Sequence, residues 1–222
     1  MSDSEIFQTS LAELHGITNR ESGIAMAEHA RVGLGNFISA SLPSSFDFDV
    51  PLMTLMSLLN RAQSFHEGAL DAVRRDNPFA AFTLLRSYAE NAAVLVRILD
   101  NPTDFRRLYP GAARESKLRI GQITGAASTR FGEFKNIYDQ LSKHAHPDPA
   151  TAFAGWAGGE GDELSWSSVP HFKTEDDAMM ACVWLIELAQ ANGQLWRECY
   201  EMLFGNHATV IPSLWEGKRA DL

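Results

Sequence analysis

Apolar residues recur at helical spacing along most of the chain, and one segment is apolar around most of its circumference. This segment runs from Pro78 to Asp100, with Asn77 as a helix cap before it and Pro102 as a stop after it. A helix of this kind is typical of the centre of a bundle. Its polar residues fall close to one line at the helical spacing: Thr83, Arg86, Ser87, Glu90, Asn91 and Arg97. We expect this line to be either a narrow window onto solvent or a buried polar site.

Similar patterns predict further helices on both sides of the central segment. A strong helix is expected over 51–75, and its short link to the central helix implies an antiparallel hairpin. A weaker helix over 20–40 contains Gly23, Gly33 and Gly35, each of which costs about 1 kcal/mol relative to alanine. Shorter helices are expected over 4–15, 103–109, 112–127 and 131–146, and the longest one follows Thr174 and stops near Gly205.

The helical pattern is interrupted at about 151–171. Segments that contain Trp156 and Trp166 flank a stretch with three glycines, and this arrangement predicts a β-hairpin. No linker, internal repeat or low-complexity segment divides the chain. We therefore predict one all-α domain over 1–222, a single helical bundle with a β-hairpin insertion.

Composition narrows the classes of function. The net charge is -9 over 222 residues, which argues against broad contact with nucleic acid, so a nucleic acid is not expected as a partner except as the substrate of a ribonuclease. The sequence has neither a secretory signal nor an apolar run of about 18 residues, and we expect no membrane contact. Cys182 and Cys199 would lie about 25 Å apart on one helix, which predicts free thiols and a cytoplasmic location.

The polar line of the central helix supplies the first candidate site. Arg86 and Glu90 are four positions apart and can pair along the helix. His144 follows Leu141 by three positions, which places it on the inward face of its own helix. An Arg-Glu-His cluster of this kind would combine a fixed cation with an acid/base pair. The alternative is a structural ion pair between Arg86 and Glu90, with His144 satisfied at a helix end.

Two other histidine patterns bear on metal binding and on ribonuclease activity. His144 and His146 are two positions apart, a spacing that separates side chains on a helix, and no cysteine or HExxH pattern accompanies them. We therefore predict no metal and no cofactor. Arg61 and His66 have the Arg-x4-His spacing of HEPN-type helical ribonucleases, although Ala62 stands where that motif has a polar residue.

Two short motifs carry a resemblance to a wider group of proteins. They are Arg86-Ser87-x-x-Glu90 on the central helix and Tyr138-x-x-Leu141-Ser142-x-x-x-His146 at the end of a later helix. In these motifs the chain resembles bacterial all-α proteins of unknown function, which are distantly HEPN-like. The resemblance implies a helical bundle with a site at Arg86, Glu90, Tyr138, Ser142 and His146. Whether His144 or His146 faces the cluster stays open.

These patterns lead to two hypotheses for function. In the first, the protein is a non-enzymatic binding or interaction module, able to form a homodimer, whose polar cluster is structural or binds a small anionic ligand. In the second, it is a HEPN-like metal-independent ribonuclease or other hydrolase that uses His144 or His146 with Arg86. The enzyme requires a solvent-reaching cleft shared by the histidine and Arg86, whereas a structural cluster would be sealed and fully paired.

Overall fold

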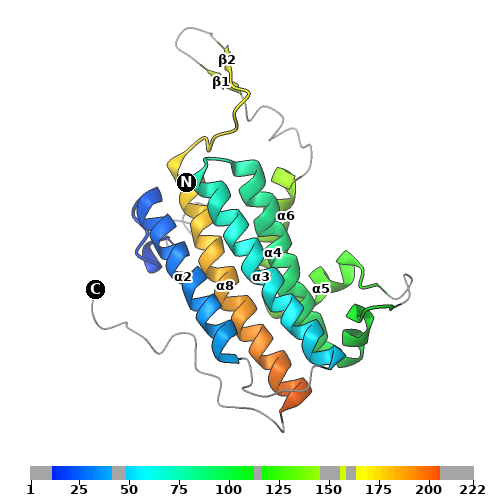
Figure 1. Cartoon of the computed structure of the whole chain (residues 1–222). Coiled ribbons are helices and arrows are strands. Elements are labelled where there is room, and N and C mark those ends of the chain that lie inside the picture. Colours follow the sequence, from blue (N-terminus) through cyan, green and yellow to red (C-terminus); the bar gives the residue numbers. More distant parts are fainter. Residues whose placement is uncertain (1–11, 42–48, 113–116, 146–155, 159–163, 206–222) are drawn as a thin grey trace.

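Four long helices lie side by side in the computed structural model and form a bundle (Figure 1). They are α2 (Arg20–Ser41), α3 (Val50–Arg74), α4 (Pro78–Asp100) and α8 (Glu175–Phe204). The structure describes residues 12–41, 49–112, 117–145, 156–158 and 164–205. Helices account for most of these residues, which confirms the predicted all-α class.

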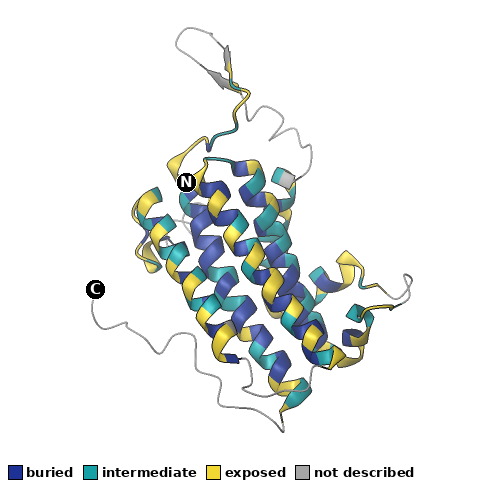
Figure 2. Cartoon of the chain, viewed as in Figure 1, coloured by how far each residue is buried: buried dark blue, intermediate teal, exposed yellow. Residues whose placement is uncertain are grey.

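The central helix of the bundle is α4. It packs against α3 and α8, and also against two shorter helices, α5 (Ile120–Arg130) and α6 (Phe134–Ala145). The 3-10 helix η1 (Pro102–Leu108) follows it and contacts it. Leu85 and Tyr88 of α4 are fully buried, and Figure 2 shows the buried positions gathered on the faces where the long helices meet. Apolar surface buried there stabilises the bundle by about 25 cal/mol per Å².

Local capping interactions fix where the long helices begin. Asn77 Oδ1 accepts a hydrogen bond from the Ala80 amide at 3.1 Å, directly before Pro78. Asp49 does the same at the start of α3, where its Oδ1 lies 2.8 Å from the Leu52 amide nitrogen. These bonds satisfy amide groups that the first helical turn leaves unpaired. The observed bounds of α4 are those predicted from its cap and its stop signal.

The predicted helix over 112–127 is wrong in its bounds. Ala112 and residues 117–119 are not helical, and α5 runs from Ile120 to Arg130. Gln122 Oε1 accepts a hydrogen bond from the Arg119 amide at 3.1 Å, which satisfies an amide at the helix start. This later start buries Ile123 and Ala127 against the bundle. The helix expected over 103–109 is the 3-10 helix η1.

Two short strands lie beyond one end of the bundle, β1 (Trp156–Gly158) and β2 (Leu164–Trp166) (Figure 1). They pair antiparallel with Trp156 opposite Trp166. The predicted β-hairpin insertion at about 151–171 stays a prediction, because 151–155 and 159–163 lie outside the described residues. The helix expected over 4–15 is described only from Ala12 onward.

Candidate functional site

Three of the predicted site residues meet at the interface between α4 and α6. Arg86 Nε and Nη2 donate to the Tyr138 hydroxyl oxygen, at 3.1 and 3.0 Å. The hydroxyl in turn donates to Glu90 Oε1 at 2.7 Å, and Arg86 Nε lies 3.2 Å from the same carboxylate oxygen. The Tyr138 hydroxyl therefore joins both charged side chains. We call Arg86, Glu90 and Tyr138 the polar cluster.

The local sequence explains why the polar cluster forms. Arg86 and Glu90 are one helical turn apart, so both side chains point from α4 toward the same part of α6. Tyr138 stacks on Phe134 of its own helix, with ring centroids 6.0 Å apart, and the Arg86 guanidinium lies 5.3 Å from the Tyr138 ring centroid. Fully buried Leu141 anchors α6. The phenol is thus held in place by packing as well as by hydrogen bonds.

The polar cluster is half-buried, and its phenol stays protonated at neutral pH. The Arg86 and Glu90 side chains are 22% and 30% exposed, so solvent reaches both of them. Burial and the hydrogen bond to Glu90 raise the pKa of Tyr138, although Arg86 opposes this shift. A protonated phenol has one O–H to donate, and Glu90 receives it.

His144 lies beside a small pocket between α4, α6 and α8. Its imidazole ring packs on Phe82, with centroids 4.2 Å apart. The pocket has a volume of about 150 Å³. Its lining combines three apolar residues with four polar ones, namely Phe82, Met180 and Trp184 with Gln140, Lys143, His144 and Asp177. Arg86 is not among the described residues that line it.

The remaining predicted residues have separate positions. Ser142 Oγ donates to the Tyr138 backbone carbonyl at 2.8 Å, an interaction within α6. His146 lies outside the described residues. The predicted residue that contacts both Arg86 and Glu90 among those the structure describes is Tyr138. The role of His144 or His146 in an Arg-Glu-His cluster stays a prediction.

The predicted polar line on α4 does not hold for Asn91. This side chain is buried and donates to the Leu58 carbonyl at 3.1 Å and to Asn192 Oδ1 at 2.9 Å, on the side facing α3 and α8. At about 100° per residue, Asn91 lies about 140° around the helix from Arg86, so the two residues face different neighbours. Arg97 contacts Asp104 of η1 at 2.7 Å. Thr83 is exposed.

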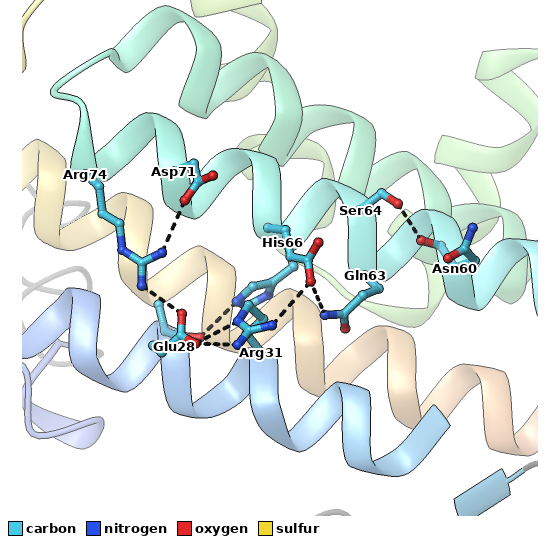
Figure 3. Close-up of polar contacts among 10 residues, drawn as sticks. Glu28, Arg31, Asn60, Gln63, Ser64, His66, Asp71 and Arg74 are labelled. Carbon is cyan, nitrogen blue, oxygen red and sulfur yellow. Dashed lines mark hydrogen bonds and ion pairs between the residues drawn. The ribbon is translucent and has the colours of Figure 1, made fainter. Parts of the chain in front are cut away.

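The Arg-x4-His pair on α3 is divided between two environments. Arg61 is exposed and its guanidinium lies 5.0 Å from the Phe65 ring centroid. His66 is fully buried and points toward α2, where its Nε2 lies 2.9 Å from the Ala27 carbonyl oxygen (Figure 3). Burial lowers the pKa of His66 to about 4. Five positions on a helix separate two side chains by about 140°, which explains the division.

The described residues offer neither a cluster of metal ligands nor a reactive thiol. No group of three or more His, Cys, Asp or Glu side chains that could hold a metal ion occurs there. Cys182 and Cys199 are free and buried, and burial raises the pKa of each thiol to about 12. Neither cysteine therefore supplies a thiolate at neutral pH.

The pocket contains residues that the sequence patterns did not identify. Lys143, Gln140 and Asp177 look like ordinary exposed helix positions, and Phe82 looks like a core residue. They meet because α4, α6 and α8 converge, and no sequence spacing encodes that convergence.

Comparison of the chain with protein-family models, curated proteins and solved structures finds no match. None of the described helices is both long enough and apolar enough to cross a membrane.

Proposed function

We propose that the protein is a binding module that takes a small anionic ligand at the junction of α4, α6 and α8. The observation that carries this proposal is the pocket of about 150 Å³ beside His144. Buried Phe82 and Trp184 line it, together with exposed Lys143. A concavity in which a few polar groups stand beside aromatic side chains is a common form of ligand site.

The polar cluster acts in this proposal as a positioning device. Tyr138 on α6 is bonded to Arg86 and Glu90 on α4, while His144 packs on Phe82 one turn earlier in α4. As α6 advances from Tyr138 to His144, its contacts on α4 move back from Arg86 to Phe82, so the two helices are antiparallel. The polar cluster thereby fixes the position of α6 along α4. A site that is already formed costs less to occupy.

The described geometry supports binding over hydrolysis. A hydrolase needs its base and its polarising cation within reach of one reacting atom. Arg86 is bonded to Tyr138 and Glu90, outside the set of described residues that line the His144 pocket. Arg61 and His66 are in separate environments. The HEPN-like ribonuclease or other hydrolase stays the alternative function.

Calorimetric titration with 3-phenylpropanoate tests the binding function. This probe has a phenyl ring for the apolar lining residues and one carboxylate for Lys143. We expect saturable binding that Lys143→Met weakens at least tenfold, or about 1.4 kcal/mol. Lys135→Met is the matched control, because Lys135 pairs with Asp139 on the exposed side of the same helix. Equal affinities for the wild type and Lys143→Met would contradict the proposal.

An RNA cleavage assay tests the alternative. Wild-type protein is compared with His144→Ala and His146→Ala on single-stranded RNA without added metal. We expect no cleavage above the background of the variants. Cleavage that disappears in either variant would replace the binding module with the hydrolase.

A single domain over 1–222, a homodimer and a cytoplasmic location also stay predictions.

A further inference from the structure

We propose that the chain after α8 folds back and binds in a groove at the end of the bundle opposite β1 and β2 (Figure 1). This segment is 206–222, which lies outside the described residues. The groove is formed by the start of α3, the 3-10 helix η1 and the last turn of α8, and its volume is about 970 Å³. It shares no described lining residue with the pocket beside His144, so this inference does not depend on the proposed function.

Apolar side chains form much of the groove surface. Phe105 of η1 is buried and contacts the Tyr109 ring edge to face, with centroids 5.4 Å apart. On α8, the Phe204 ring packs on Tyr200 with centroids 5.3 Å apart, and Met202 is 40% exposed. Four of these residues line the groove, namely Phe105, Tyr109, Met202 and Phe204. Apolar side chains gathered in one groove are typical of an interaction surface.

The groove begins where the described chain leaves α8. Gly205 is the last described residue and is itself one of the lining residues. The segment that follows is therefore tethered at the edge of the groove, and the five residues from Gly205 to Val210 can extend over about 17 Å. A short tether gives an effective concentration in the millimolar range, so weak contacts are enough to hold the segment in place.

The sequence of 206–222 fits an apolar groove. Val210, Ile211, Leu214 and Trp215 occur within six positions. Pro212 biases Ile211 toward an extended backbone and opposes a continuation of the helix through this stretch. The segment can therefore present its aliphatic and indole side chains to a surface, and the tryptophan supplies the largest apolar contact.

Charge favours 206–222 over the chain segment 42–48, which also borders the groove through Asp49. The charged lining residues have a net negative charge: Asp49, Glu201 and Arg106. The last turn of α8 contains no basic residue to balance the negative end of its dipole. Lys218 and Arg219 follow the apolar stretch and supply positive charge, while Glu216 can face Arg106. The segment 42–48 contains Asp47 and no basic residue.

Chymotrypsin cleavage of the full-length protein after Trp215 tests the docking. When release is fast relative to cleavage, the cleavage rate follows the released fraction. Met202→Asp places a charge in the groove and should speed this cleavage about tenfold, as measured by mass spectrometry. Met53→Asp is the matched control, because Met53 is 54% exposed on α3 and is not among the described lining residues. Equal rates in the wild type and Met202→Asp would overturn the proposal.

Further measurements identify the occupant of the groove. The double variant Lys218→Gln/Arg219→Gln should also speed cleavage after Trp215, but less than Met202→Asp does, because exposed charges contribute little. The cleavage rate of the wild type should not change over about a hundredfold dilution. Protection that is lost on dilution would assign the groove to a second copy, and protection of Phe48 in place of Trp215 would assign it to 42–48. Either result would overturn the proposal. Circular dichroism checks the folding of each variant.

Discussion

The Tyr138 hydroxyl is bonded to a cation and an anion at once. It accepts hydrogen bonds from Arg86 and donates one to Glu90 at 2.7 Å. Without the hydroxyl, Arg86 and Glu90 would still lie 3.2 Å apart, as an ordinary pair along one helix. The hydroxyl converts that pair into a contact between α4 and α6.

Tyr138→Phe should therefore loosen α6 without removing its aromatic packing. We expect the free energy of unfolding to fall by about 1–2 kcal/mol, because hydrogen bonds to charged groups are lost while the ring stacking on Phe134 remains. Urea denaturation measures the change. In a double-mutant cycle with Glu90→Gln, the two effects should be coupled. Additive effects would show that the hydroxyl does not act through Glu90.

His66 is a buried neutral imidazole in the core of the bundle. Its Nε2 lies 2.9 Å from the Ala27 carbonyl oxygen, which fixes the proton on that nitrogen. Glu28, Arg31 and Glu67 are the charged groups that act on the ring, and their effects on its pKa are smaller than that of burial. Burial therefore disfavours the charged form in the fold.

Stability should fall with acidification before the carboxylates titrate. The pKa of His66 is about 4 in the fold and 6.5 in the unfolded chain, so the unfolded state binds more protons between these values. Full stability is present above pH 6.5 and is lost as the pH falls toward 4, by about 3 kcal/mol. Urea denaturation at a series of pH values measures this loss.

His66→Gln should flatten this dependence between pH 6.5 and 5. His29→Gln is the matched control, because His29 is exposed on the neighbouring helix α2. An unchanged slope in His66→Gln would mean that another group titrates in this range.

At the scale of elements, α2 packs closely on its neighbour at one glycine and has open space beside another. A Cβ at Gly23 would lie 3.1 Å from Cys182 Cβ and 3.2 Å from its Sγ, and Cys182 is fully buried. Gly23 thus lets α2 approach α8 closely. A Cβ at Gly33 would meet nothing within 4 Å. A chain of ion pairs also joins α2 to α3, through Glu28 and Arg74 at 2.7 Å (Figure 3).

Alanine substitutions in α2 should have opposite effects at these two positions. Gly33→Ala should raise the free energy of unfolding by about 0.5–1 kcal/mol, because alanine costs less backbone entropy in a helix. Gly23→Ala should lower it, since the added methyl group would press on the fully buried Cys182 side chain. Thermal denaturation of the two variants provides a matched comparison. Stabilisation by Gly23→Ala would contradict the close contact with α8.

At the scale of the whole molecule, a pair of amides joins three helices inside the core. Asn91 of α4 donates to Asn192 of α8 at 2.9 Å and to the Leu58 carbonyl of α3 at 3.1 Å. Asn192 also donates to the Leu188 carbonyl at 2.8 Å. Both amides are buried. This pairing sets how α3, α4 and α8 align along their lengths.

The effects of substituting Asn91 and Asn192 on the free energy of unfolding should not be additive. Asn192→Leu leaves the Asn91 amide with a lost partner in the core, which we expect to lower the free energy of unfolding by about 2 kcal/mol. The double variant Asn91→Leu/Asn192→Leu should lose less than the sum of the two single effects. Chemical denaturation of the three variants measures the coupling. If the two single effects add up to that of the double variant, Asn91 and Asn192 are not energetically coupled.

The chain sequence predicts the long helices well because their signals are local. Asn77 with Pro78 marks the start of α4, and the cap at Thr174 marks the start of α8. The start of α5 was predicted at Ala112 but lies at Ile120. Arg119 is not a typical N-cap residue, so the sequence carries no strong start signal there. Within the site, the sequence identified Arg86, Glu90 and Tyr138 and the pairing of Arg86 with Glu90, but not the hydrogen bonds of both residues to Tyr138.

By itself, the sequence determined the all-α class, the bounds of α4 and the pairing of Arg86 with Glu90, because each depends on residues within a few turns of one helix. The tertiary structure decided which neighbour each face of α4 meets. Arg86 faces Tyr138, 52 positions away, whereas Asn91 faces Asn192, 101 positions away. It also assembled the pocket from Phe82, Lys143 and Asp177. Such contacts depend on how whole helices pack, and helical periodicity contains no information about which helices become neighbours.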